Sequence, residues 1–191
     1  MKNFGKVILA SSSPRRFNLL KNFNFNEVQI AKPLVNEKNF IIHGSFKQSV
    51  KKIALEKALS IKQNKSLTDY SFIISGDTVV VRAGKILHKP ITKEQVRSYL
   101  SELSGKKHSV YGGICVVTKK KILKRAIITD VYFNNIYNND LCEEFLEDGI
   151  GKAGGYAIQG YASKFIRKIR GCYTNVVGLS IPEVYKILKI L

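Results

Sequence analysis

The stretch from Val7 to Arg16 constrains the fold of this chain more than any other. It begins with a short apolar run, Val7 to Ala10, which predicts a buried strand. Three serines and a proline follow, then Arg15 and Arg16, and after them apolar residues at helical spacing. We therefore expect a strand, a polar turn and the beginning of a helix.

The polar turn has two interpretations. Backbone N–H groups at the beginning of a helix attract anions, and guanidinium groups bind phosphate through paired hydrogen bonds. The turn could therefore bind phosphate through its serines and through Arg15 and Arg16. It could equally be an ordinary connection with an N-cap serine and two solvated arginines. The Walker pattern G-x-x-x-x-G-K-[ST] does not occur in the sequence.

Strand and helix patterns alternate along the rest of the chain. Apolar runs predict strands over residues 27–30, 72–81, 86–87, 108–117 and 122–133, with an interruption at Gly76-Asp77-Thr78 and a hairpin turn at 83–84. Helical spacing predicts helices over 45–61 and 92–103, a short helix capped by Asn139 and a terminal helix that starts with a capping box at Ser180. Hairpins and crossovers both occur, so we expect an α/β fold with a mixed sheet.

Length and composition exclude several classes of protein. A chain of 191 residues that is 45% hydrophobic is typical of one domain with its own core. No apolar run approaches the roughly 20 residues that a membrane span needs, and the polar residues 1–6 do not resemble a secretory leader. Scattered Cys115, Cys142 and Cys172 argue against disulfides and a thiolate zinc site. We expect a cytoplasmic protein.

The net charge of +18 introduces an alternative function. A strongly basic chain is typical of a nucleic-acid-binding module, which would use a basic surface and stacking aromatic residues. Here the lysines and arginines are spread along the sequence, and the longest run, 119–121, lies between two predicted strands as a hairpin tip. We therefore do not favour nucleic acid as the partner.

Asp77 is the acid that stands out, because it lies inside an apolar strand pattern. A buried carboxylate needs a partner or a function. Asp77 could be a general base or a metal ligand, or an aspartate in a bulge that bonds to nearby backbone. Glu37 could join it around Mg²⁺ or Mn²⁺, which prefer oxygen ligands, or could be a plain surface acid.

Three other polar residues have positions that suggest a role. Lys57 lies on the predicted helix 45–61, Lys89 follows a strand directly, and Gln159 follows the glycine-rich segment 149–155. A glutamine amide offers a donor and an acceptor, which suits the edge of a pyrimidine ring. Each residue alone is also compatible with ordinary solvent exposure.

Six motifs occur in order and together resemble the Maf family of nucleoside triphosphate pyrophosphatases: Leu9 to Arg16, Ser75 to Val80, His88 to Pro90, Leu103 to Gly105, Lys152 to Gly160 and Asn175 to Leu179. The resemblance runs from about residue 7 to the C-terminus and implies one domain over 1–191. It implies an elongated mixed sheet flanked by helices, with a cleft between two lobes, as in inosine-triphosphatase-like proteins. It also implies metal-dependent hydrolysis of a nucleoside triphosphate to the monophosphate and pyrophosphate.

The resemblance implies roles for individual residues as well. The family's catalytic acid matches Asp77. Its phosphate-binding residues match Ser11, Ser13, Arg15 and Arg16, and its other polar cleft residues match Glu37, Lys57 and Lys89. The positions that separate subgroups match Arg15, Thr78 and Gln159, a combination that resembles the subgroup acting on dTTP and UTP. The turn 149–152 departs from the family, because Gly151 replaces a usual aspartate. An inactive member that regulates cell division is an alternative, and a homodimer is among the expected assemblies.

Overall fold

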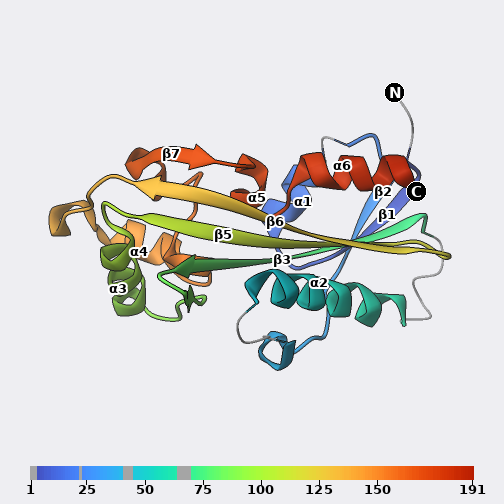
Figure 1. Ribbon diagram of the computed structural model, residues 1–191, viewed down its shortest axis with the longest axis horizontal. Coiled ribbons are helices and arrows are strands. Elements are labelled where there is room, and N and C mark those ends of the chain that lie inside the picture. The colour runs from blue at the N-terminus through green and yellow to red at the C-terminus, as the bar shows by residue number, and fades with distance from the viewer. Residues whose placement is uncertain (1–3, 22, 41–44, 64–69) are drawn as a thin grey trace. The chain divides into compact units, whose positions relative to one another are not determined.

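The computed structural model describes residues 4–21, 23–40, 45–63 and 70–191. Within these ranges, seven strands form one mixed sheet in the order β2-β1-β3-β5-β6-β7, with β4 paired to β3 (Figure 1). The strands are β1 (Lys6–Ala10), β2 (Glu27–Ala31), β3 (Phe72–Arg82), β4 (Lys85–Leu87), β5 (Lys107–Val117), β6 (Ile122–Phe133) and β7 (Ile166–Arg170). β1 is parallel to both β2 and β3. β4 is antiparallel to β3, and β7 is antiparallel to β6. The predicted α/β fold with a mixed sheet is confirmed.

Helices connect and cover these strands. The α-helices are α1 (Pro14–Leu20), α2 (Phe46–Lys62), α3 (Lys93–Leu103), α4 (Glu143–Gly149), α5 (Tyr173–Val177) and α6 (Ile181–Ile190). Four short 3₁₀ turns join them: η1 (Glu37–Phe40), η2 (Asn138–Asp140), η3 (Ala153–Gly155) and η4 (Tyr161–Phe165). Among the described helices, none has the length and apolar character needed to cross a membrane.

The chain divides into two compact units. The first contains residues 1–77, 112–127 and 178–191, and the second contains residues 78–111 and 128–177. The long strands β3, β5 and β6 each contribute residues to both units. That these units form a single domain stays a prediction.

Two apolar layers cover opposite faces of the strands in the first unit. One layer joins α1 and α6 to the sheet through Leu20, Ile187, Leu188, Leu9 and Ile74. The other joins α2 to the sheet through Ala54, Ala58, Ile61, Ile8 and Ile73, and Figure 1 shows α2 and α6 on opposite sides of the strands. Because successive side chains of a strand point to opposite faces, positions 73, 75 and 77 of β3 face α2, whereas 74 and 76 face α1 and α6.

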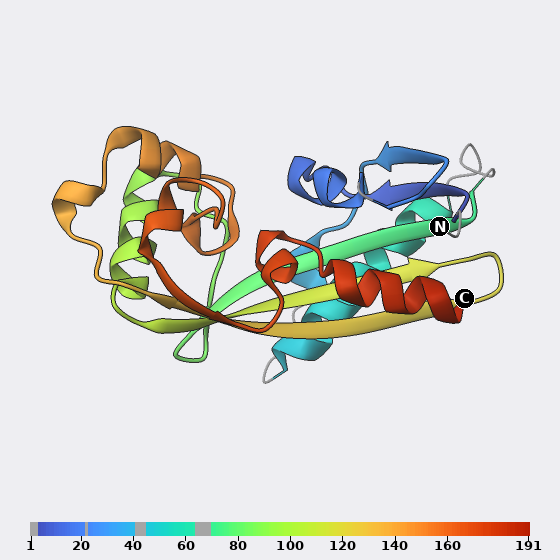
Figure 2. The ribbon, with the colours of Figure 1, turned by 90° about the horizontal axis from the view of Figure 1, so that it is seen from above.

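The second unit packs α3 against α4 and η3, and Figure 2 shows α3 (yellow-green) beside α4 (orange). Thr92 caps α3, since its hydroxyl accepts the Gln95 N–H at 3.3 Å, and Gln95 Oε1 accepts the Ile91 N–H at 2.8 Å. A buried aromatic cluster of His108, Phe133 and Tyr156 lies in the same unit.

The structure corrects the predicted interruption of β3. The strand β3 is continuous from Phe72 to Arg82 and includes Gly76, Asp77 and Thr78. It pairs with β1 as far as Ser75 and with β4 from Val80. Asp77 therefore lies inside a strand, and its carboxylate pairs with Lys57 and not with nearby backbone as the bulge interpretation supposed.

Two predicted helix caps are also wrong. Asn139 lies inside η2, where the Asp140 carboxylate accepts the Tyr137 N–H at 2.8 Å, and α4 begins later, after Cys142. Ser180 precedes α6 without a side-chain cap bond. The capping box does not form there, because Glu183 pairs instead with Lys186 at 2.7 Å.

Candidate active site

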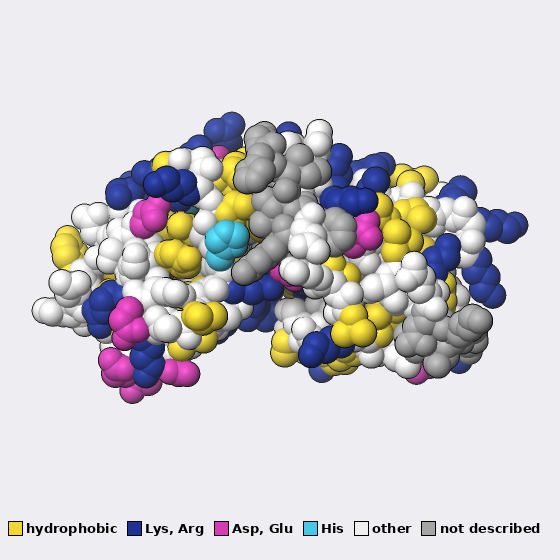
Figure 3. Space-filling model, turned by 90° about the horizontal axis from the view of Figure 1, so that it is seen from below, with side chains coloured by type: hydrophobic (Ala, Val, Ile, Leu, Met, Phe, Trp, Pro, Cys, Tyr) yellow, Lys and Arg dark blue, Asp and Glu magenta, His cyan; other side chains and the backbone are white. Residues whose placement is uncertain are grey.

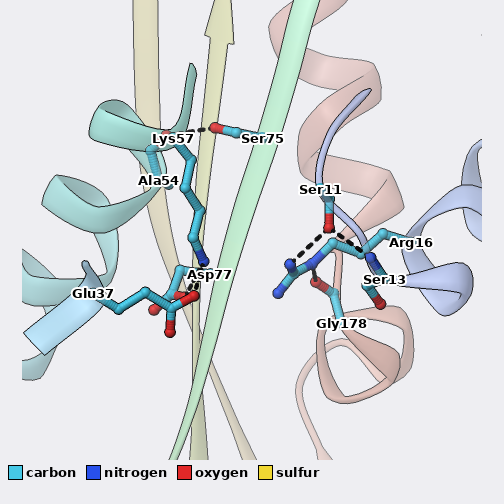
Figure 4. A network of polar contacts seen from close by, with 9 residues as sticks. All are labelled: Ser11, Ser13, Arg16, Glu37, Ala54, Lys57, Ser75, Asp77 and Gly178. Atoms are coloured by element: carbon cyan, nitrogen blue, oxygen red, sulfur yellow. Dashed lines mark hydrogen bonds and ion pairs between the residues drawn. The ribbon is translucent and has the colours of Figure 1, made fainter. Parts of the chain in front are cut away.

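The turn between β1 and α1 has the predicted arrangement of strand, polar turn and helix. The buried Ser11 hydroxyl accepts the Ser13 N–H and the Arg16 Nη1, each at 3.1 Å. Arg16 Nε donates to the Gly178 carbonyl at 2.8 Å, which ties the turn to the segment before α6. Figure 4 shows these four residues gathered at one place. The arginine is thereby held by the protein in one orientation.

Arg16 lies against β3 at a position where the strand has no side chain. A Cβ atom built on Gly76 would lie 3.3 Å from Arg16 Nε, so a larger residue would crowd the guanidinium. Burial lowers the pKa of Arg16, the carboxylates of Asp77 and Glu37 raise it, and Arg15 lowers it. The charge of Arg16 thus interacts with both acids that the sequence predicts.

Lys57 joins those two acids in a second cluster. Lys57 Nζ lies 2.8 Å from Asp77 Oδ1 and 2.7 Å from Glu37 Oε1. The exposed fractions of the Lys57 and Asp77 side chains are only 7% and 4%, whereas that of Glu37 is 38%. Figure 4 shows all three side chains converging from α2, β3 and η1. The Ser75 hydroxyl donates to the Ala54 carbonyl at 2.5 Å, which joins β3 to α2 beside the cluster.

Asp77 keeps one oxygen available for chemistry. Its Oδ2 is buried and has no hydrogen-bond partner among the described residues. Two carboxylates and one ammonium leave the cluster with one net negative charge. A buried carboxylate oxygen without a partner is costly, which makes it a ready acceptor for a water molecule or a cation.

The second unit carries Lys89 and Gln159 on two segments that are hydrogen-bonded to each other. The Gly151 N–H donates to the Pro90 carbonyl at 2.9 Å, and the Gly154 N–H donates to the His88 carbonyl at 3.3 Å. Gly154 has a φ of +72° and packs against Val80, where a Cβ would lie 2.9 Å from the valine side chain. Lys89 and Gln159 themselves are exposed. Glycine is required at position 154, because a side chain there would collide with Val80.

The predicted residues therefore fall into groups. The first unit brings together Ser11, Ser13 and Arg16 in one cluster and Glu37, Lys57 and Asp77 in another, with Arg15 half-buried on α1. The second unit contains Thr78, Lys89 and Gln159. Sequence reasoning assigned no role to the Gly178 carbonyl, although the motif Asn175 to Leu179 contains that residue. No group of three or more His, Cys, Asp or Glu side chains in the described ranges could hold a metal ion alone.

The positive charge is not confined to one stripe. On the face shown in Figure 3, Lys and Arg side chains occur in several groups separated by acidic, polar and apolar side chains. This distribution agrees with the scatter of basic residues along the sequence.

One protein family and several named relatives are similar to this chain. The model of a family described as Maf-like protein matches residues 6–191. A Clostridium perfringens protein is 37% identical over 188 residues, which is 96% of each chain, and a Clostridium beijerinckii protein is 40% identical over 96% of this chain and 98% of its own. Both are named dTTP/UTP pyrophosphatase. The structure of the Staphylococcus aureus Ham1 protein is 13% identical, has a TM-score of 0.47 and matches over 96% of this chain and 98% of its own.

Proposed function

The chain belongs to the Maf family, and we propose that it hydrolyses nucleoside triphosphates, with dTTP and UTP preferred, to the monophosphate and pyrophosphate. Such a reaction would serve the upkeep of the nucleotide pool. The observation that carries the proposal is the cluster of buried Asp77 and Lys57 with the partly exposed Glu37, next to an arginine that interacts with both acids. The names of relatives at 37% and 40% identity support the choice of substrate.

The charge of the substrate determines what the site must supply. A triphosphate carries about four negative charges, which basic side chains and a cation must neutralise in the transition state. Arg15, Arg16, Lys57 and Lys89 are the basic residues that we assign to this task, with Ser11 and Ser13 as hydrogen-bond partners in the turn. Arg16 is oriented in advance by Ser11 and Gly178, so little reorganisation is needed when the phosphates bind.

We assign the activation of water to Asp77. Water must attack the α-phosphorus while pyrophosphate departs from the opposite side. The unpartnered Oδ2 can accept a proton of that water, because Oδ1 is already engaged by Lys57 at 2.8 Å. Lys57 fixes the rotation of the carboxylate and keeps Oδ2 in a defined direction.

The acids also suit a divalent metal. Mg²⁺ in phosphate-transferring sites is held by one or two carboxylates together with substrate phosphates, rather than by a cage of protein ligands alone. The open Oδ2 of Asp77 and the partly exposed Glu37 carboxylate fit that description. Bound Mg²⁺ or Mn²⁺ would supply Lewis-acid stabilisation of phosphate charge. A cytoplasmic location and a homodimer stay predictions from the sequence.

Recognition of the base is assigned to Gln159, with Thr78 and Arg15 as the accompanying positions of the dTTP/UTP subgroup. The amide of Gln159 can donate one hydrogen bond and accept another from the imide edge of thymine or uracil. A site built on hydrogen bonds discriminates strongly, because the wrong base leaves polar groups unpaired.

A nucleotide panel tests the proposal. Purified protein with Mg²⁺ or Mn²⁺ is given dTTP, UTP, CTP, GTP and ATP, and pyrophosphate and orthophosphate are measured separately. We expect pyrophosphate release, with the highest kcat/KM for dTTP and UTP. Orthophosphate alone, or no turnover with any nucleotide, would refute the activity, whereas a preference for a purine would refute only the substrate choice.

A further inference from the structure

An ion pair bridges the point where the chain leaves α4. Asp148 Oδ1 accepts a hydrogen bond from Lys152 Nζ at 2.9 Å, and the same ammonium also donates to the Asp148 carbonyl. The two side chains are half-buried, with exposed fractions of 27% for Asp148 and 18% for Lys152. Although the two residues are four positions apart, they do not form an ion pair along one helix, because α4 ends at Gly149 and Ile150 has extended backbone angles. The pair therefore stabilises a change of chain direction.

The same carboxylate also contacts the far end of the following segment. Asp148 Oδ2 is buried, has no hydrogen-bond partner in the described part of the chain, and would lie 2.5 Å from a Cβ atom built on Gly160. The Gly160 N–H in turn donates to the Ala157 carbonyl at 3.0 Å. Asp148 thus lies close to both ends of the segment 152–160, and a larger residue at position 160 would meet its carboxylate.

The middle of this segment is anchored by buried side chains. The Tyr156 hydroxyl lies 2.7 Å from His108 Nε2, and both Tyr156 and Ile158 are buried. Gln159, the next residue, is exposed. Apart from the single turn η3, the segment has no regular secondary structure, so these contacts and the Asp148 bridge determine its conformation.

We propose that Asp148 is a positioning residue for substrate selection. By bridging Lys152 and Gly160, it fixes the direction in which Gln159 presents its amide and so increases discrimination between bases. Gly151 leaves the turn without a carboxylate of its own beside Lys152, and Asp148 provides one from the end of α4. The effect on selection rests on the proposed function, whereas the effect on the segment's conformation does not.

The first measurement is hydrogen exchange of the amides in residues 152–160. Asp148→Asn keeps the shape of the side chain and removes its charge, so the charge-assisted bond to Lys152 weakens and exchange should become about tenfold faster. The matched control is Glu147→Gln, which removes the neighbouring carboxylate of α4, whose partner is Lys93 at 3.2 Å. Unchanged exchange in Asp148→Asn, or equal acceleration in both variants, overturns the proposal.

The second measurement is the ratio of kcat/KM for dTTP to that for GTP. We expect this ratio to fall about tenfold in Asp148→Asn, mainly through a higher KM for dTTP, with kcat within about threefold of wild type. Lys152→Met should lower it similarly, and the double variant should be no worse than either single one, since both act on the same ion pair. Glu147→Gln should keep the ratio.

The outcomes separate this inference from the proposed function. If wild type hydrolyses dTTP but Asp148→Asn keeps its selectivity, the positioning role is wrong and the enzymatic function stands. If wild type hydrolyses no nucleotide, the proposed function and the role in selection fail together, and the exchange measurement still decides whether Asp148 holds the segment. A general loss of kcat with unchanged selectivity would show a merely structural residue and would also overturn the inference.

Discussion

Two clusters of ionisable side chains in this protein differ in charge: one holds charged groups and the other holds neutral groups. In the first unit, Lys57 is held between Glu37 and Asp77 with N–O distances of 2.7 and 2.8 Å. In the second unit, His108, Phe133 and Tyr156 pack edge to face with ring centroids 5.0 to 5.4 Å apart. Burial, with the nearby Arg82, lowers the pKa of His108 to about 4 and burial raises that of Tyr156, so this second cluster is neutral at pH 7.

The difference separates a cluster suited to chemistry from one suited to support. Buried ion pairs rarely contribute much net stability, because desolvation offsets their attraction, so a buried charged cluster with an open oxygen suggests a functional reason for its presence. A neutral aromatic cluster with an internal hydrogen bond contributes packing and fixed geometry. Variants that disturb each cluster should therefore differ in what they impair.

The largest effect on stability should come from removing the cation of the charged cluster. Lys57→Met leaves Asp77 buried without its partner and should lower the free energy of unfolding by about 3–5 kcal/mol. Urea denaturation at pH 7.5 measures this change. The control is Lys93→Met, which removes the exposed partner of Glu143 and Glu147 and should leave the denaturation midpoint unchanged. Equal midpoints in the two variants would contradict the comparison.

Asp77→Asn should separate activity from stability. The amide cannot take a proton from water, so kcat/KM for pyrophosphate release should fall by roughly 10²-fold or more. Stability should change much less than in Lys57→Met, because Lys57 keeps Glu37 as a partner at 2.7 Å. Activity within a few fold of wild type would remove Asp77 from the mechanism.

The neutral cluster should make stability depend on pH. The folded-state pKa of His108 is about 4, below its ordinary value of 6.5, so between these pH values the unfolded chain binds a proton that the folded protein excludes. The stability that neutral His108 contributes is fully present above about pH 6.5 and is lost as the pH falls toward 4. The resulting decrease in the free energy of unfolding should be about 2 kcal/mol at pH 5. Urea denaturation at pH 8 and pH 5 tests this in wild type and His108→Gln. A pH dependence that is equally steep in both proteins would assign it to other groups.

The smallest effect should come from the hydroxyl of Tyr156. Tyr156→Phe keeps the ring between His108 and Phe133 and removes the 2.7 Å hydrogen bond, which should cost about 1 kcal/mol. Thermal and urea denaturation at pH 7.5 measure it. A loss as large as that of Lys57→Met would mean that the neutral cluster is no less dependent on polar pairing than the charged one.

Much of the fold was predictable because its periodicity is local. The hairpin of β5 and β6 and the turn at Ala83 and Gly84, with φ values of +47° and +77°, follow from apolar runs and turn residues. Helix α5 was not predicted, because five residues, Tyr173–Val177, are too few to show a helical period. The continuity of β3 was missed because glycine and aspartate usually end strands, whereas here Gly76 makes room for Arg16.

The site was predictable only in part. Asp77 was predicted because an acid in an apolar strand is out of place, and Arg16 because it follows a polar turn. Gly178 orients Arg16 through its backbone carbonyl, and because every residue has such a carbonyl, the sequence does not reveal this role. Glu147 and Asp148 are adjacent acids on one short helix. Only the position at which α4 ends distinguishes the half-buried Asp148 from the exposed Glu147.

The alternation of side chains along β3 limits how this protein can evolve. Leu9 and Ala10 of β1 pair with Ile74 and Ser75, and this register turns Asp77 toward Lys57 and Gly76 toward Arg16. Inserting or deleting one residue just before Asp77 would exchange the two faces, placing the acid against α1 and α6. Substitutions in this strand can be selected one side chain at a time, whereas a codon gained or lost there would take Asp77 away from Lys57 and Glu37 in one step.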